Sequence, residues 1–169
     1  MLRDLAASDL PAALAVINAA ARAYRGVIPD DRWHEPYMSA TELASEIAAG
    51  VVFRVIEQEG RLAAVMGLQD KGDVVLVRHA YVAPAAQRAG LGTQLLREMS
   101  RLVDKPILIG TWADARWAID FYVRNGFTVL PPDDTNHLLR TYWSIPERQI
   151  ATSVVLADGR WMGRRAAGV

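Results

Sequence analysis

Apolar residues along this chain follow two patterns, a helical spacing and short continuous runs. The helical spacing predicts helices over residues 10–24, 39–49, 91–103, 114–125 and, as a short one, 136–143. The runs are rich in Val, Ile and Leu, and they predict strands over 2–5, 51–56, 62–68, 74–82, 107–109, 127–130 and 153–156. Tight-turn sequences at Glu59-Gly60 and at 70–73 make the strands between 51 and 82 an antiparallel meander.

Strands and helices alternate from Val74 onward, and this order predicts that the strands at 74–82 and 107–109 are parallel. With 169 residues, the chain can build one domain with a real core. We therefore expect a single α/β domain over residues 1–169. The segment 160–169 is either a hairpin return or a loose tail, and its Trp161 and Met162 would suit a homodimer interface.

The composition excludes several classes of function. Nineteen basic and nineteen acidic residues cancel, so no global field attracts nucleic acid or an anionic membrane. The chain has no cysteine, which excludes disulfides, thiolate metal sites and a cysteine nucleophile. No run approaches the roughly 18 apolar residues of a membrane span, and Asp4 and Asp9 interrupt any signal-peptide core. We expect a cytoplasmic protein without a metal, a nucleic-acid partner or a membrane partner.

The segment Gln87-Arg88-Ala89-Gly90-Leu91-Gly92 lies between a predicted strand and a predicted helix. The start of a helix leaves backbone N–H groups without carbonyl partners, and the helix dipole adds positive potential there. Gly90 and Gly92 let an anion approach the backbone closely, and Arg88 adds a positive charge. The segment therefore predicts an anion site suited to a pyrophosphate.

The spacing Q-x-x-G-x-G in this segment resembles the acetyl-CoA pyrophosphate loop of the GNAT superfamily of N-acetyltransferases. A second segment, from Ala118 through Tyr122 to Gly126 and Phe127, resembles the A-x-x-x-Y-x-x-x-G-F sequence that the family carries downstream. Both segments occur in the family's order, with a helix and a strand between them. The resemblance extends over about 2–156.

The resemblance implies a twisted, mostly antiparallel mixed sheet of six or seven strands, flanked by helices, whose fourth and fifth strands splay apart. It also implies acetyl-CoA as cosubstrate. The pantetheine amides would bond to the backbone of Ala80, Tyr81 and Val82. The pyrophosphate would be held by Gln87, Arg88, Ala89, Gly90, Leu91, Gly92 and Thr93.

Acetyl transfer to an amine requires a proton acceptor for the ammonium and a donor for the departing thiolate. Tyr122 matches the family's acid position, although its place on an apolar stripe is also typical of a core residue. The family's usual base positions correspond here to Leu76 and Arg78, and neither is a base. His79 is adjacent, but strand alternation directs it to the other face unless a bulge re-aims it. His34, Glu35, His137 and direct proton loss to water remain open.

The acceptor pocket is the least determined part of the sequence. Arg78 would pair with an anionic group of the acceptor, or else with Asp73 or Glu57 of the chain. Trp112 is either a wall of the pocket or a core residue. The loop 26–36 carries Trp33, His34 and Glu35, which either line the pocket or belong to a solvated loop with one buried tryptophan.

The most consistent function is acetyl-CoA-dependent N-acetylation of a primary amine on a small molecule, by direct attack in a ternary complex. A protein or peptide N-acetyltransferase and a non-catalytic acyl-CoA-binding module remain as alternatives. A nucleotidase is disfavoured because Gly90-Leu91-Gly92-Thr93 lacks the lysine of a Walker loop.

Overall fold

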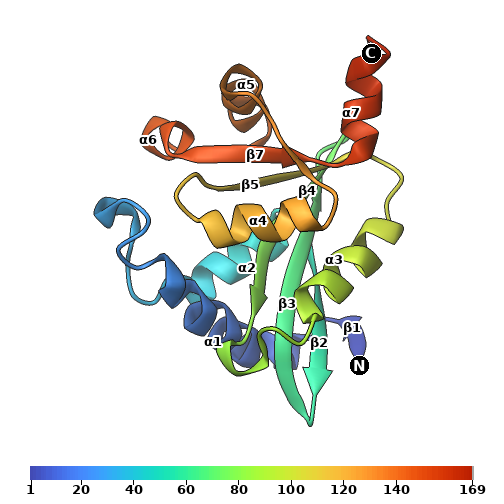
Figure 1. The fold of residues 1–169 in the computed structure, drawn as a ribbon. Coiled ribbons are helices and arrows are strands. Elements are labelled where there is room, and N and C mark those ends of the chain that lie inside the picture. The colour runs from blue at the N-terminus through green and yellow to red at the C-terminus, as the bar shows by residue number, and fades with distance from the viewer. Residues whose placement is uncertain (169) are drawn as a thin grey trace. The chain divides into compact units, whose positions relative to one another are not determined.

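The computed structural model describes residues 1–168, which form two compact units (Figure 1). The first unit comprises Met1–Asp70 and Val77–Val103, and the second comprises Lys71–Leu76 and the chain from Asp104 onward. The boundary between them falls inside one strand, after Leu76. Each unit is described by itself.

The first unit is a long β-hairpin with helices packed against it. Its elements are β1 (Leu2–Asp4), α1 (Leu10–Ala21), α2 (Ala40–Ala48), β2 (Val51–Gln58), β3 (Arg61–Asp70), most of β4 (Val75–Val82) and α3 (Leu91–Arg101). Strands β1, β2 and β3 pair antiparallel, with Val55 opposite Val65. Glu59 and Gly60 both have positive φ, as the predicted two-residue hairpin turn requires.

Alternate residues of β2 direct their side chains into the core of this unit. Val51, Phe53 and Val55 are buried with Ile17 of α1 and Leu43 of α2. Ser39 begins α2 with a capping box, because its Oγ accepts from Glu42 N–H while its own N–H donates to the Glu42 carboxylate. The helix predicted to begin at residue 39 is therefore started by this cap.

Helix α1 begins at the predicted residue, Leu10. Asp9 makes no side-chain cap to α1, and it instead accepts from Ala6 N–H and from Arg3. Three large apolar residues are exposed: Ile47, Leu102 and Val123. All three lie in the last turn of a helix or directly after it.

Strand β3 carries a glycine at the point where it passes β4. A Cβ on Gly67 would lie 2.5 Å from Val51 Cγ1, 3.0 Å from Phe53 Cε1 and 3.2 Å from the Arg78 carbonyl oxygen. The first two atoms belong to packed core side chains and the third to the backbone of β4. The close approach of these strands therefore requires glycine.

We expect Gly67→Ala to lower the free energy of unfolding by about 1–3 kcal/mol, because the added methyl overpacks a closed site. Gly163→Ala is the matched control, since a Cβ on this helical glycine of α7 meets nothing within 4 Å. Urea unfolding of both variants measures the difference. Equal stability of the two variants would contradict the close packing at Gly67.

The second unit contains β5 (Ile107–Trp112), α4 (Arg116–Arg124), β6 (Thr128–Val129), α5 (Pro132–Tyr142), α6 (Glu147–Ala151), β7 (Ser153–Ala157) and α7 (Gly159–Ala166). β7 pairs antiparallel with both β5 and β6, so it lies between them. The strand order is β1-β2-β3-β4-β5-β7-β6, with β4 and β5 parallel, and this mixed seven-stranded sheet confirms the predicted fold class.

The core of the second unit is built on β5 and β7. Leu108, Val155 and Ala157 are buried with Leu138 and Leu139 of α5. Figure 1 shows α5 and α6 with β7, in the orange to red part of the chain. Trp143 packs on the same core, and its ring lies 3.1 Å from where a Cβ on Gly110 would be.

The predicted C-terminal elements need correction. Residues 160–166 belong to a helix, α7, rather than to a hairpin or a loose tail, residues 167–168 form a turn after it, and residue 169 lies outside the described residues. Asp158 caps α7 by accepting from Trp161 N–H. Helix α5 begins at Pro132, four residues earlier than predicted, because proline is well placed in a first turn. The short α6 was not predicted.

None of the helices within residues 1–168 combines the length and the apolar character that a membrane span needs. In the same range, no group of three or more His, Asp or Glu side chains is arranged to hold a metal ion.

Candidate functional site

The loop 87–92 joins β4 to α3 in the first unit. Arg88 has a φ of 66° and Gly90 a φ of 76°, so two of its residues are left-handed. Backbone turns of this kind gather N–H groups into a concave arrangement that favours anions. Gln87, Arg88, Ala89 and Gly90 are exposed, and Gln87 Nε2 donates to the Val82 carbonyl at 3.4 Å. Four of the seven predicted anion-binding residues, 87–90, therefore lie on one accessible turn, whereas Leu91 is buried and Gly92 and Thr93 are partly buried in the first turn of helix α3 (Leu91–Arg101).

Helix α3 begins at this turn with an open N-terminus. Gly90 is its N-cap, and no side chain caps it, whereas α2 and α7 are capped by Ser39 and Asp158. The first backbone bond along α3 runs from Gln94 N–H to the Gly90 carbonyl at 2.9 Å. The N-terminal N–H groups and the helix dipole thus point positive potential toward the turn.

Strand β4 leads into the loop through Ala80, Tyr81 and Val82, all partly buried. The strand is irregular just before them, because His79 has a φ of 51°. This left-handed residue breaks the two-residue alternation of side chains along β4. The sequence left undecided whether a bulge re-aims His79. The irregularity at this residue shows that it does.

As a result, the consecutive residues Arg78 and His79 reach the same side chain. Arg78 Nη2 lies 2.8 Å from Glu46 Oε2 on α2, and His79 Nε2 lies 2.9 Å from the same oxygen. Arg78 Nη1 also donates to Gln69 Oε1 at 2.7 Å, and the buried Gln69 donates to the Ala49 carbonyl. The expected partners of Arg78, Asp73 and Glu57, were wrong, and its partner is Glu46.

Glu46 was not identified from the sequence. In the sequence, Glu46 is one of several polar residues of an amphipathic helix. Only the bulge in β4 brings His79 to it. Burial opposes ionisation of Glu46, but His79 and Arg78 outweigh that effect and hold the pKa of its carboxyl below the ordinary value. Glu46 is therefore an anion fixed between two basic side chains.

We expect Glu46→Gln to destabilise the protein at neutral pH, and we expect this effect to shrink in acid. A lowered folded-state pKa stabilises the folded state above the ordinary carboxyl pKa of 4.5 and loses that effect as the pH falls. Protonated Glu46 and glutamine are both neutral, so the two proteins should converge. Urea unfolding of both at pH 7 and in steps below pH 4.5 tests this, and a constant gap would contradict it.

Aromatic residues gather around the loop after α1. Tyr37 stacks on Tyr24 at 5.8 Å and on Trp33 at 5.7 Å between ring centroids, and the His34 ring lies 6.2 Å from it. Tyr24 also meets Tyr81 of β4 edge-on at 6.5 Å. Trp33 is only partly buried, so the loop is an aromatic cluster on β4 rather than a solvated loop around one buried tryptophan.

Glu35 is exposed and lies 4.0 Å from Arg22, which is exposed too, so the two form a weak ion pair.

In the second unit, Tyr122 is buried, with its ring edge-on to Phe121 at 5.0 Å and to Phe127 at 6.1 Å. Trp112, at the end of β5, is also buried, as its core interpretation requires. His137 lies on the exposed side of α5.

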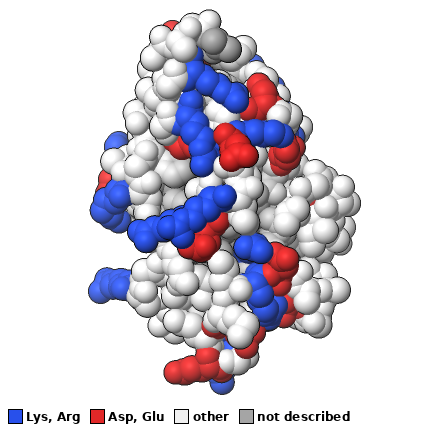
Figure 2. All heavy atoms as spheres, turned by 90° about the vertical axis from the view of Figure 1, so that its right-hand side faces the viewer, with Lys and Arg blue, Asp and Glu red and all other residues white. Residues whose placement is uncertain are grey.

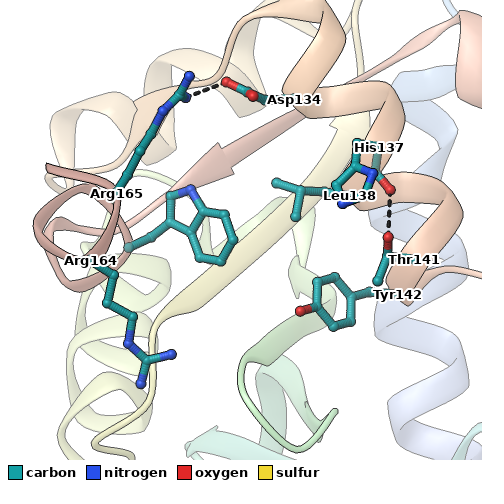
Figure 3. A pocket seen from close by; sticks show the side chains of 8 residues that line it. Asp134, His137, Leu138, Thr141, Tyr142, Arg164 and Arg165 are labelled. Carbon is teal, nitrogen blue, oxygen red and sulfur yellow. Dashed lines mark hydrogen bonds and ion pairs between the residues drawn. The ribbon is translucent and has the colours of Figure 1, made fainter. Parts of the chain in front are cut away.

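Each unit also has a hollow, and His137 lines the one in the second unit. In the second unit, α5 and α7 enclose about 290 Å³ beside Tyr142 and Arg164 (Figure 3). Figure 3 shows Arg165 paired with Asp134 and Thr141 donating to the His137 carbonyl. Burial, and then the bond from its hydroxyl to Asp73, raise the pKa of Tyr142 to about 12. These contacts are internal to the unit.

The other hollow, of about 430 Å³, lies beside α1 in the first unit. Arg3 on its wall is already paired with Asp9 and Glu57. On the face drawn in Figure 2, basic and acidic side chains are interspersed. That face offers no continuous basic surface to a nucleic acid.

Residues 49–129 match the family model of the acetyltransferase (GNAT) domain. This range includes β4, the loop 87–92 and Tyr122. No curated protein sequence matches the chain.

Solved structures share the fold at low identity. PaiA N-acetyltransferase from Thermoplasma acidophilum, in complex with coenzyme A, is 17% identical, with a TM-score of 0.72 over 94% of this chain and 97% of its own. The ribosomal-protein-S18-alanine N-acetyltransferase from Escherichia coli is 21% identical, with a TM-score of 0.62 over 94% and 92%. N-acetylglutamate synthase from Neisseria gonorrhoeae, complexed with coenzyme A and N-acetyl-glutamate, is 19% identical, with a TM-score of 0.63 over 94% of this chain and 34% of its own.

The family match covers the two segments whose sequences carried the resemblance. The chain thus matches the acetyltransferase (GNAT) domain over residues 49–129 and shares the fold of solved N-acetyltransferases.

Proposed function

We propose that this protein is an N-acetyltransferase that uses acetyl-CoA and acetylates a primary amine on a small molecule, by direct attack of the amine in a ternary complex. The observation that carries the choice of a small acceptor is the aromatic cluster of Tyr24, Trp33 and Tyr37, which contacts β4 at Tyr81. Aromatic faces attract ammonium groups and give a small amine a large contact area.

A basic protein tail would instead need an acidic surface to attract it. The loop after α1 does not provide one, because Asp30, Asp31 and Glu35 are balanced by Arg25 and Arg32 within the same segment and by Arg22 beside Glu35. This balance supports a small acceptor over a basic peptide.

In the proposed complex, the turn 87–93 holds the diphosphate, and the backbone of Ala80, Tyr81 and Val82 bonds the pantetheine amides. The amine nitrogen attacks the thioester carbon, a tetrahedral intermediate forms, and the CoA thiolate leaves. Tyr122 donates a proton to that thiolate.

The test is a panel of small primary amines and of short peptides with free N-termini, each incubated with acetyl-CoA, with release of free thiol followed over time. We expect turnover with one or more small amines and a product heavier by one acetyl group in mass spectrometry. Turnover with peptides alone would overturn the choice of acceptor, and a failure to bind CoA would overturn the whole proposal.

A further inference from the structure

The hollow between α5 and α7 in the second unit combines an apolar wall with basic side chains (Figure 3). We propose that it is a binding site for a small carboxylate that carries a compact apolar group, such as an aromatic ring. None of its lining residues has a part in the proposed acetyl transfer, and binding there can be measured without acetyl-CoA.

The apolar wall is formed by Leu138 and Tyr142 of α5 and by Trp161 of α7. Leu138 is buried in the core of this unit, and the two aromatic residues are partly buried and pack on the same core. Rigid aromatic rings offer a ligand contact area at little cost in side-chain freedom. The 290 Å³ of the hollow correspond to roughly ten water molecules at about 30 Å³ each, so a compact ligand of similar size fits.

Arg164 supplies the charge that a carboxylate needs. Its Nη1 donates to the Asp73 carbonyl at 3.1 Å, and this acceptor is neutral. Within residues 1–168, no carboxylate forms an ion pair with its guanidinium, whereas Arg165 is paired with Asp134. A guanidinium carries several N–H donors in a planar fork, so one bond to a carbonyl leaves others for a ligand carboxylate.

The acidic groups near the hollow are already engaged. Asp134 pairs with Arg165, and the Asp73 carboxylate accepts from the Tyr142 hydroxyl at 2.6 Å. Tyr142 itself is a neutral phenol, because burial and then this bond raise its pKa to about 12. Arg164 is therefore the charged group of the hollow that an added carboxylate would neutralise.

Asp73 also ties the two walls together. Tyr142 of α5 bonds its carboxylate, and Arg164 of α7 bonds its carbonyl. Figure 3 shows these two side chains on opposite sides of the hollow, with the tyrosine hydroxyl directed into the space between them. The hollow is thus formed before a ligand binds, which lowers the entropic cost of binding.

The first experiment is calorimetric titration of the full chain with three probes. Phenylacetate has the charge and the ring and contains about ten non-hydrogen atoms, which suits the hollow. 2-Phenylacetamide has the same shape without the charge, and acetate has the charge without the ring. We expect phenylacetate to bind at least about 10-fold more tightly than either, since each of the others lacks one of the two contacts. No heat of binding with phenylacetate at millimolar concentration, or equal affinity for the amide, would overturn the proposal.

Variants of two arginines on α7 locate the site. Arg164→Gln should raise the Kd for phenylacetate by roughly 10- to 100-fold, as expected when a charged donor is lost. Arg160→Gln is the matched control, because Arg160 Nη1 also donates to a backbone carbonyl at 3.1 Å, that of Lys105, and the residue does not line the hollow. It should bind phenylacetate like wild type. Equal affinities of wild type and Arg164→Gln would overturn the proposal, and thermal unfolding shows whether each variant is folded.

The indole N–H of Trp161 gives an independent readout. This nitrogen is buried, and it has no hydrogen-bond partner among residues 1–168. The chain has five tryptophans, so a proton–nitrogen spectrum shows the Trp161 signal directly, and Trp161→Phe identifies it by its loss. Phenylacetate should shift this signal with the same Kd as in calorimetry, because Trp161 lines the hollow. A shift confined to the other indole signals would place the ligand elsewhere and overturn the proposal.

Discussion

Replacing Tyr122 by phenylalanine should lower kcat by about 10²- to 10⁴-fold, the range of a positioned acid, while the affinity for CoA barely changes. The hydroxyl is the only group removed. The edge-on contacts of the ring with Phe121 and Phe127 remain, so the buried site stays filled. An effect confined to kcat is therefore expected from the loss of a proton donor to the departing thiolate.

Tyr142→Phe is the matched control for this change. It removes a tyrosine hydroxyl from the same unit, where that hydroxyl bonds Asp73 at 2.6 Å. We expect it to lower stability by about 1 kcal/mol, as the loss of one hydrogen bond does, and to leave turnover unchanged. Steady-state kinetics and calorimetric CoA binding distinguish the two variants. If Tyr122→Phe kept wild-type kcat, Tyr122 would be a core residue only.

Arg88→Gly should weaken CoA binding while the fold becomes no less stable. Arg88 has a φ of 66°, which is strained for arginine and free of strain for glycine. Loss of its charge should raise the Kd for CoA by roughly 10- to 100-fold, as expected for one charge-assisted hydrogen bond of 1.5–3 kcal/mol. At saturating acetyl-CoA, kcat should stay close to wild type.

Glu59→Gly is the control for the backbone part of this effect. Glu59, in the β2–β3 turn, also has a positive φ, of 50°, and is exposed. It should share the relief of strain without any change in CoA affinity. Thermal unfolding and titration with CoA measure the two effects separately. Equal CoA affinities in Arg88→Gly and wild type would show that the guanidinium does not contact the diphosphate.

The helices and strands of the first unit were predicted well because their signals are local. Apolar spacing, the Ser39 cap and the Glu59-Gly60 turn act within a few residues of each other, so the sequence displays them directly. The C-terminal elements were predicted less well. Helix α7 is short, contains glycine and is rich in arginine, so its local signal is weak. Its partly buried residues Trp161 and Met162 pack on the core that includes Val155 and Ala157 of β7, a contact that the local sequence does not display.

The residues of the candidate site also differ in how far the local sequence could predict them. The turn 87–92 and Tyr122 were predicted from sequence because each belongs to a contiguous segment with its own spacing. Glu46 was missed because its role depends on a residue 33 positions later, at a bulge that the hydrophobic pattern does not reveal. Gly67 gave a weaker signal, since a glycine inside a strand indicates a close approach without naming what approaches.

The sequence by itself indicated the family and the cosubstrate and predicted the anion turn, because backbone donors at a glycine-containing helix start are fixed by local geometry. The tertiary structure alone decided which groups surround His79. One left-handed residue reverses the direction of a side chain in β4, and only packing of α2 and β3 against that strand holds the residue there and supplies Glu46 as its partner.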